Sequence, residues 1–265
     1  MKRLVITIFT VSLLFGSSSF AGSTGSEELK SSSKEGTEEC FEGFSRGMFS
    51  FNQGLDKIFF KPIAIGYRTL PLFLRKGTGN MVHNISNLLT IPNNILQGNF
   101  LEAGNTTVRL AVNTTIGILG FFDPAEKMGY SRKGKEDYGQ TFGVWGVDTG
   151  CYFVMPVLGP TTFRDFVGTV GDVWGDPWYN MTIANDTLVG NSTFKDSDYY
   201  ISRGTSTVDF RAKNIESFES LEQNSLDFYA SVRSLYLQDR QQKIANSKKV
   251  IDTMDDGDWE EIESN

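Results

Sequence analysis

Apolar residues recur at steps of three and four along the segment that begins at residue 41. The positions are Phe41, Phe44, Met48, Phe51, Leu55, Ile58 and Phe59. This spacing puts them on one face of an α-helix. Pro62 is expected to end that helix, because a proline in a helix interior removes a backbone hydrogen bond. The pattern therefore predicts an amphipathic helix near the start of the folded region.

A second amphipathic pattern lies toward the other end of the chain. Its apolar positions are Phe218, Leu221, Tyr229, Val232 and Tyr236, with charged residues on the opposite side. Ser225 interrupts this apolar stripe, so the helix can start afresh there. This is the longest helix that the pattern predicts.

The middle of the chain does not follow this three- and four-residue spacing. Residues 110–129 are apolar at both ends, broken by Gly117 and Gly120, and stopped by Asp123-Pro124. This length suits a helix that is buried or that dips into a membrane, and it is too short to cross one. Residues 138–160 interleave glycines with aromatic residues and valines, which predicts a tightly turning backbone with short extended pieces.

The two ends of the chain differ from the apolar region between them. Residues 1–21 have a basic start, a short apolar run and small residues before Gly22, as in a cleaved signal peptide. Residues 22–39 are Gly, Ser, Thr, Glu and Lys with one leucine, so we expect a flexible tether. Residues 248–265 are expected to form a solvated acidic tail. This leaves residues 40–247 as one folded domain.

The charge balance argues against nucleic acid as a partner. Removing Lys2 and Arg3 from the 25 basic residues leaves 23 against 32 acidic residues, so the expected mature chain carries a net charge near −9. An acidic exported protein is a poor ligand for a polyanion. Its two cysteines, Cys40 and Cys151, allow one disulfide but make no framework.

A G-x-S-x-G motif at residues 43–47 raises the hypothesis of a serine hydrolase with Ser45 as the nucleophile. Such a serine needs a strand before it, and here the expected tether precedes it. His83 is the only histidine, and Asp56 is the only aspartate between it and Ser45. A triad compressed into so short a segment leaves no room for the sheet that should hold it. We therefore expect no catalytic residues.

Other common chemistry has equally little support in the sequence. One histidine and two distant cysteines cannot build a typical zinc site, so no metal is expected. The chain contains neither of the glycine-rich nucleotide-binding motifs, and no cofactor is expected. The adjacent carboxylates Glu136 and Asp137 are expected to be solvated.

Adjacent aromatic pairs are the features that suggest a lipid interface. Phe59-Phe60 precedes Lys61, and Phe121-Phe122 precedes Asp123-Pro124. Neighbouring residues on a helix point about 100° apart, so such pairs fit one narrow core-facing stripe poorly. An apolar residue beside a charge or a helix breaker is typical of a segment lying in a membrane interface. Most of the other phenylalanines are expected to belong to an ordinary core.

Several motifs, in this order, resemble the VacJ/MlaA family over about residues 38–247. The matching segments are FEGFSRGMFSFNQGLD, KPIAIGYRTLP, NISNLLTIPNNILQG, RLAVNTTIGILGFFDPA, EDYGQTFGVWGVDTGCYFVMPVLGPTTFRDFVG and YASVRSLYLQDRQQKIAN. The most specific piece is the run from Glu136 to Thr141, followed by Trp145-Gly146-Val147 and Leu158-Gly159-Pro160.

The resemblance implies a mainly α fold: a ring-like arrangement of amphipathic helices with a glycine-rich irregular segment lining a channel. It implies a protein seated at the periplasmic face of the bacterial outer membrane. Such a protein removes mislocalised phospholipid from the outer leaflet and passes it to a periplasmic lipid carrier, working beside a trimeric outer-membrane porin. This is transport without covalent chemistry. The family usually has Asn-Arg at Ser45-Arg46, so the G-x-S-x-G arises at a non-catalytic position.

A lipid path requires polar lining for the headgroup and apolar lining for the tails. Candidate residues for it are Gly139, Gly143, Trp145, Gly146, Gly150 and Tyr152. The glycines would let the backbone approach the path, and the two aromatic side chains would suit its amphipathic rim. The alternative is that the glycines only make tight turns.

The chain departs from the family pattern at three places. Its signal peptide has no lipobox, so a lipoprotein anchor is not supported and attachment would rest on apolar surface and porin contacts. Cys40 and Cys151 stand where the family commonly has proline, which raises the hypothesis of a disulfide, with free buried thiols as the alternative. The family asparagine is lost at Ser45. A serine esterase using Ser45 and a non-transporting surface antigen remain the alternative functions.

Overall fold

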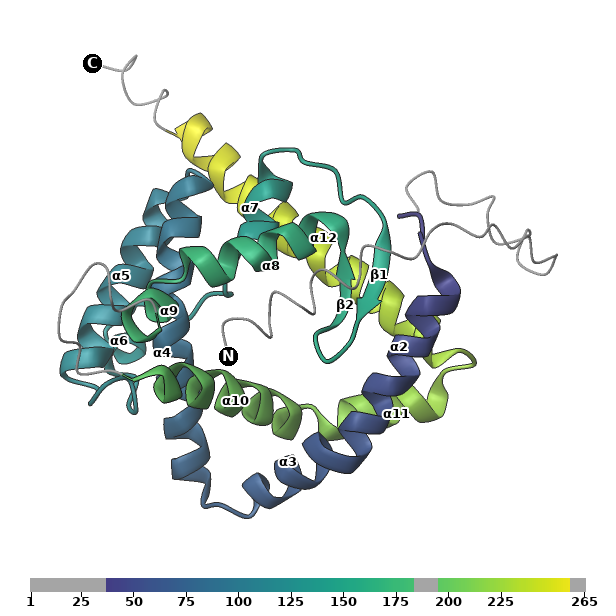
Figure 1. Cartoon of the computed structure of the whole chain (residues 1–265). Coiled ribbons are helices and arrows are strands. Elements are labelled where there is room, and N and C mark those ends of the chain that lie inside the picture. The colour runs from purple at the N-terminus through teal and green to yellow at the C-terminus, as the bar shows by residue number, and fades with distance from the viewer. Residues whose placement is uncertain (1–36, 184–194, 258–265) are drawn as a thin grey trace. The chain divides into compact units, whose positions relative to one another are not determined.

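The computed structural model describes residues 37–183 and 195–257. The expected signal peptide, residues 22–36 of the expected tether and residues 258–265 of the expected tail lie outside the described residues. Helices dominate the described chain (Figure 1), so the prediction of a mainly α fold is confirmed. Its ring-like part stays a prediction.

The elements follow one another with short connections. In chain order they are α2 (Glu42–Leu55), the π-helix η2 (Asp56–Phe60), α3 (Lys61–Arg68), α4 (Leu72–Leu96), α5 (Phe100–Thr115), α6 (Pro124–Lys127), α7 (Tyr138–Val144), β1 (Tyr152–Met155), β2 (Gly159–Thr162), α8 (Phe163–Gly175), α9 (Pro177–Thr182), α10 (Asp196–Lys213), α11 (Ile215–Asn224) and α12 (Phe228–Gly257).

The first amphipathic helix does not end at Pro62, contrary to the prediction. α2 continues through η2 into α3, and Pro62 lies in the first turn of α3. The N–H of Lys61 donates to the carbonyl of Asp56, five residues earlier, so the π-helical turn carries the chain to Pro62. Pro62 itself has no N–H to donate, and the helix continues beyond it to Arg68.

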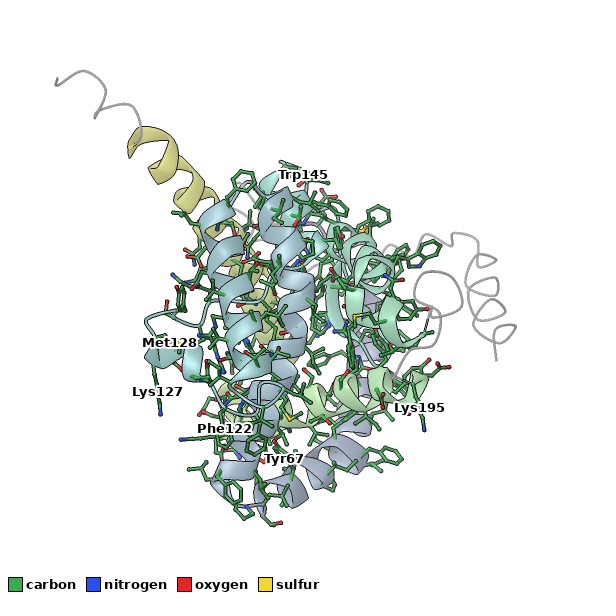
Figure 2. All side chains as sticks on the ribbon, turned by 90° about the vertical axis from the view of Figure 1, so that its left-hand side faces the viewer. Tyr67, Phe122, Lys127, Met128, Trp145 and Lys195 are labelled. Atoms are coloured by element: carbon green, nitrogen blue, oxygen red, sulfur yellow. A yellow bond between two sulfur atoms is a disulfide. The ribbon has the colours of Figure 1, made fainter. Side chains whose placement is uncertain are left out.

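Helices α4 and α5 pack side by side as an antiparallel pair, as both views show (Figures 1 and 2). Between them Gly98 adopts φ +83°, and the Asn99 side chain accepts a hydrogen bond from the N–H of Glu102 to cap α5. After Thr115 the chain leaves the helix through Ile118, Leu119 and Gly120, all with positive φ. The predicted break within residues 110–129 is therefore present.

The glycine-rich segment contains both a helix and a hairpin. β1 and β2 pair antiparallel, with Tyr152 opposite Thr162 and Met155 opposite Gly159. These strands fit the expected short extended pieces. α7 is a regular helix that the glycine content did not predict. Asp137 caps its N-terminus, because the Asp137 carboxylate accepts a hydrogen bond from the N–H of Gln140 at 2.8 Å.

The long C-terminal pattern divides at Ser225, as predicted. α11 ends at Asn224, and α12 begins at Phe228. α12 remains helical to Gly257, so residues 248–257 of the expected tail form backbone helix. A tail without an apolar face can still extend a helix that already exists, because propagation is far easier than nucleation.

The last residues of the expected tether are held against the fold. The N–H of Tyr152 donates to the carbonyl of Glu38 at 2.9 Å, and Arg233 donates to the carbonyl of Thr37 at 2.6 Å. Cys40 and Cys151 form a disulfide with a Cα–Cα distance of 5.6 Å. Of the two alternatives for these cysteines, the structure contains the disulfide, which joins the start of α2 to the start of β1.

Replacing both cysteines, Cys40→Ser with Cys151→Ser, is expected to lower the free energy of unfolding by about 2–4 kcal/mol. The reason is that the bond closes a loop across a sequence separation of 111 residues and so restricts the unfolded chain. Denaturant unfolding in mild detergent measures the change. Reductant should destabilise the wild type and leave the double variant unaffected. Two titratable thiols in unreduced, denatured wild type would contradict the expectation.

Candidate functional site

The interior of the α4–α5 pair is polar. The buried side chains of α4 other than glycine are Asn84, Asn87, Thr90, Asn93 and Asn94, and α5 buries Thr106, Arg109 and Asn113 besides Ala103. Asn84 donates to Thr114 Oγ1 at 2.8 Å, and Asn93 accepts from Thr141 of α7 at 2.7 Å. Several of these groups hydrogen-bond to one another where a soluble helix pair normally buries apolar residues. Asn84 Oδ1 and Asn87 Nδ2 are buried without a partner in the described part of the chain.

Large apolar side chains lie instead on the outside. Fully buried residues in the described part of the chain include no leucine, phenylalanine or methionine. Exposed ones occur along much of the chain and include groups at the ends of the α4–α5 pair: Leu72 and Phe73 at the start of α4, Phe100 and Leu101 at the start of α5, and Ile118, Leu119 and Phe122 after α5. Such extensive exposed apolar surface marks contact with a membrane or another protein.

A buried ion pair fixes the corner after α5. Arg109, with 2% of its side chain exposed, donates to Asp123 at 2.7 Å, and Asn113 donates to the other carboxylate oxygen at 2.9 Å. Arg132 reaches the same carboxylate at 3.1 Å. Burial alone would raise the pKa of Asp123, but the hydrogen bonds from Arg109 and Asn113 hold it below its usual value.

A second buried network joins α7, α8 and α12. Arg240 of α12 donates to both carboxylate oxygens of Asp137, at 2.6 and 2.9 Å, and to Asp165 of α8 at 2.9 Å. Tyr236 donates to Asp165 at 2.7 Å. Burial opposes the charges of both aspartates, yet Arg240 keeps their pKa values below the ordinary range. The expectation that Asp137 is solvated is therefore wrong, because α12 brings a cation to it from more than 100 residues away.

Two carboxyl groups beside this network have raised pKa values. Burial and the nearby charge of Asp137 raise the pKa of Glu136 to about 7, although Gln97 donates to its carboxylate at 3.1 Å. Burial and Asp137 also raise the pKa of Asp172 to about 7. Asp172 lines a cavity of about 220 Å³ with Asp137, Asp165, Tyr236 and Arg240. Glu136 is largely buried too, so its expected solvation is also wrong.

An apolar groove of about 280 Å³ lies between the α2–η2–α3 segment, the hairpin and the C-terminal helices. Its aromatic lining consists of Phe49, Phe60, Phe210, Phe218 and Phe228. Ion pairs stand along its edge, namely Lys57 with Glu222 at 2.8 Å, Lys61 with Glu219 at 2.7 Å and Arg211 with Asp56 at 2.7 Å. A groove with this lining can hold a hydrocarbon chain while its charged edge stays in contact with water or headgroups.

The sequence-derived lipid-path residues do not form one cluster. Gly139 and Gly143 are buried in α7, where an added Cβ would lie 2.6 Å from Arg240 and 2.4 Å from Ile244, respectively. Trp145 and Gly146 are exposed at the end of α7, and the Trp145 indole donates to the carbonyl of Leu96 at 2.9 Å. Figure 2 shows Trp145 at one end of the α4–α5 pair. Gly139 and Gly143 therefore serve close packing of α7.

The remaining two candidates lie at the hairpin. Gly150 is exposed with φ +66° directly before the disulfide. Tyr152 is fully buried and packs with Val154 and Tyr229. This differs from the expected place on an amphipathic rim, because β1 turns Tyr152 inward between α2 and α12.

The membrane-interface candidates divide within each pair. Phe59 and Phe122 are exposed, with 56% and 55% of their surface accessible. Phe60 lines the apolar groove, and Phe121 packs its ring on Gly77 of α4. In each pair one ring faces inward and the other outward. Phe59 and Phe60 are helical neighbours, which point in different directions, whereas Phe121 and Phe122 lie in the turn between α5 and α6.

The three residues of the hypothetical hydrolase triad have separate partners. Ser45 is fully buried, and its hydroxyl accepts a hydrogen bond from the N–H of Val154 at 3.3 Å. Asp56 is paired with Arg211. Burial, with the nearby charges of Arg132 and Lys135, lowers the pKa of His83 to about 4. Ser45 is thus a buried contact between α2 and β1.

The sequence alone did not reveal Arg109, Asp165 and Arg240 as site residues. Arg240 lies in a segment rich in Arg, Gln and Asp, a composition typical of a solvated helix face. Its partners, Asp137 and Asp165, are distant in sequence. Asp165 follows the Thr162 cap of α8, which explains its position but not its partner. None of the described helices has the length and hydropathy that crossing a membrane requires.

Comparison with known proteins connects this architecture to one family. A family model described as "MlaA lipoprotein" matches residues 37–243. A Rickettsia bellii protein is 32% identical over 209 residues, covering 78% of this chain and 77% of its own length. The "Intermembrane phospholipid transport system lipoprotein MlaA" of Escherichia coli K12 is 30% identical over 221 residues, covering 80% of each chain. Its Haemophilus influenzae namesake is 29% identical over 224 residues, covering 80% and 81%.

A solved structure gives the same result at the level of the fold. It is described as "Structural basis for maintenance of bacterial outer membrane lipid asymmetry". Its TM-score is 0.65 at 26% sequence identity, and the match covers 78% of this chain and 99% of that one.

Gly168→Ala is expected to separate α7 from α8 and to destabilise the protein by at least about 1 kcal/mol, as overpacking generally does. A Cβ at Gly168 would lie 2.3 Å from the backbone nitrogen of Gly139, which no side-chain rotation relieves. Gly47→Ala in α2 is the matched control, because a Cβ there meets nothing within 4 Å and alanine favours a helix. Thermal unfolding measures the melting temperatures of both variants, and equal values for Gly168→Ala and Gly47→Ala would contradict the expectation.

Glu136→Gln is expected to raise the free energy of unfolding at pH 8 by roughly 1–3 kcal/mol, with a smaller gain at pH 5. The folded pKa lies above that of the unfolded chain, so the stability contributed by the neutral carboxyl is present at low pH. It is lost as the pH rises from about 4.5 to about 7. Glu126→Gln, at an exposed position of α6, is the control. A gain that does not change between pH 5 and pH 8 would refute the expectation.

Proposed function

Because the chain belongs to the MlaA family, we propose that it is a bacterial outer-membrane component of intermembrane phospholipid transport. In this role it removes mislocalised phospholipid from the outer leaflet and passes it to a periplasmic lipid carrier. The names of the Escherichia coli and Haemophilus influenzae relatives support transport of phospholipid, and the matching solved structure concerns outer-membrane lipid asymmetry.

The observation that carries the proposal is the reversal of polarity in the helical fold. Most buried side chains of the described chain are polar or charged, while many of its leucines, phenylalanines and isoleucines are exposed. In water this arrangement would be unfavourable, because each Å² of exposed apolar surface costs about 25 cal/mol of free energy. In a lipid leaflet the exposed side chains are solvated by acyl chains, and the interior offers hydrogen-bonding groups to a headgroup.

A ring-like arrangement around the lipid path is supported by the order of contacts. α2, η2, α3, α10, α9, α8, β2 and β1 each contact the next, and β1 contacts α2 again. Trp145 and Gly146, which are exposed at the end of α7, are the candidates for one end of the path. Gly139 and Gly143 bring α7 close to α12 and so shape the surroundings of the path without lining it with a side chain.

The apolar groove is the proposed resting place for acyl chains. Phe60 and Phe210 line the groove with apolar surface, and the ion pairs of Lys57 and Lys61 stand along its edge. Transfer along such a surface needs no nucleophile. The buried contact of Ser45 with Val154 supports this reading over a serine esterase.

The proposed location is the periplasmic face of the outer membrane, beside a trimeric porin. Exposed side chains at Phe59, Phe122 and the helix corners would hold the protein in the leaflet, together with porin contacts. The relatives are named lipoproteins. For this chain we propose that attachment does not depend on an acylated cysteine, since Cys40 is in a disulfide.

Phospholipid retained by the purified protein tests the proposal. Mass spectrometry of lipids extracted from the wild type and from Ser45→Ala, both purified in mild detergent, should find intact two-chain phospholipid on both. Lysophospholipid or free fatty acid with the wild type alone would establish hydrolysis instead.

Deleting the gene provides the cellular test and separates transport from a passive surface role. Phospholipid in the outer leaflet should rise, and the gene carrying Ser45→Ala should reverse the rise as well as the wild-type gene does. An unchanged outer leaflet would leave a surface antigen as the better interpretation.

A further inference from the structure

A cavity of about 550 Å³ lies between α3, α4, α6 and α10, apart from the apolar groove. Five cationic side chains line it: Arg68, Arg75, Lys76, Arg132 and Lys213. We call this group the basic corner. Three carboxylates, Asp123, Glu126 and Asp209, also line the cavity, so its wall has an excess of two positive charges (5 − 3 = 2). This excess stands out in a chain whose formal net charge is −7.

Two of the three carboxylates at the basic corner, Asp123 and Asp209, are already engaged, and the third, Glu126, is exposed. Asp123 is shared by Arg109, Arg132 and Asn113, which leaves one positive charge in surplus over that carboxylate. Asp209 accepts from Lys213 at 2.6 Å and from the Tyr67 hydroxyl at 3.3 Å. Arg132 also donates to Asn80 at 2.7 Å, which fixes its guanidinium at the cavity wall.

Two of the cations have no carboxylate partner in the described part of the chain. Arg75 donates through Nε to the carbonyl of Leu70 at 3.1 Å, and its terminal nitrogens remain available. Lys76 is exposed and forms no ion pair there. A guanidinium and an ammonium on adjacent residues, backed by Arg132, suit the oxygens of a phosphate group.

Apolar side chains border the same cavity. Leu72 lies in its wall, and Phe73 beside it is 63% exposed. The chain segment after α5 comes to the same corner, because Asn80 donates to the carbonyl of Phe121 at 3.2 Å and the Phe121 ring covers Gly77. Figure 2 shows Tyr67 and Phe122 toward the end of the α4–α5 pair opposite Trp145. Phosphate-binding cations thus stand next to surface that suits acyl chains.

We propose that the basic corner binds the phosphate group of a phospholipid headgroup, with Arg75 and Lys76 as the principal contacts and Arg132 as the supporting charge. The lipid's acyl chains lie against Leu72, Phe73 and Phe122. This rests on the proposed function and goes beyond it, because it assigns a headgroup site away from the apolar groove. A free phosphate ion shares the headgroup chemistry, and the apolar border favours the lipid.

The test measures binding to the full-length protein in a non-ionic detergent. The probes are dihexanoyl phosphatidylglycerol, dihexanoyl phosphatidylcholine and inorganic phosphate, each titrated by calorimetry at low and at moderate salt. Arg75→Gln with Lys76→Gln removes the two free cations. Lys127→Gln with Lys243→Gln is the matched control, since it removes the same charge at exposed positions of α6 and α12. Lys76→Gln alone serves as a second variant, because this exposed side chain carries no contact that the fold needs.

We expect wild type and control to bind both lipids more tightly than inorganic phosphate, with affinity that falls as salt rises. The double variant should bind the lipids at least about tenfold more weakly, and Lys76→Gln should show a smaller loss in the same direction. Equal lipid affinity in the double variant and the wild type would overturn the proposal. Inorganic phosphate binding as tightly as the lipids would overturn the headgroup assignment in favour of a free anion.

Different experimental results would contradict the proposed function and the proposed headgroup site. Purified wild type without any phospholipid would count against transport itself. Equal amounts of intact phospholipid on the wild type and the double variant, with equal titration affinities, would remove only the basic corner.

Discussion

The α4–α5 pair buries hydrogen-bonding side chains, and this constraint decides where everything else can lie. Asn84, Asn93 and Asn113 each need partners, because an unpaired buried amide costs on the order of 1–3 kcal/mol. Thr114, Thr141 and Asp123 supply them from three different elements. Since the interior is occupied by these contacts, the leucines and phenylalanines of the same helices have only the outer surface left. The outward apolar surface is thus a consequence of the polar interior.

Two buried arginines extend that constraint to the rest of the fold. Arg109 ties the corner after α5 to α6 through Asp123, and Arg240 ties α12 to α7 and α8 through Asp137 and Asp165. Buried ion pairs contribute little net stability, because removing both charges from water offsets their attraction. Their effect is geometric: a guanidinium with two fixed carboxylates permits one packing of the three helices. Losing one partner would leave a buried charge, which is far more costly than losing the pair.

Periodicity and local chemistry predicted the parts of this fold that depend on neighbours in sequence. The amphipathic start at residue 42, the break at Gly117 and Gly120 and the restart at Ser225 are all local. Pro62 was misjudged because the π-helical turn before it cannot be seen in a three-to-four residue rhythm. Family resemblance came from the order of motifs, which no physical reading of a single segment provides.

The site was less accessible to sequence reasoning, because its residues come together only through tertiary contacts. Glu136 and Asp137 were expected to be solvated because they are adjacent in sequence, but the fold brings Arg240 of α12 to Asp137. Tyr152 looked suited to an amphipathic rim, but the pairing of β1 with β2 turns it into the core. The glycines at 139 and 143 were recognised as positions of close approach, yet what approaches them is α12.

A phospholipid imposes two demands that one uniform surface cannot meet, and the fold separates them. Its acyl chains need an apolar wall, and the proposed one is the groove that Phe60, Phe210 and their neighbours line between α2 and the C-terminal helices. Its phosphate needs cations that are not already neutralised, and Arg75 and Lys76 meet this condition on α4. Both regions border α3 and α10, so the same two helices hold the apolar groove on one side and the basic corner on the other. A lipid that moved between them would exchange hydrocarbon contact for charge without leaving the protein.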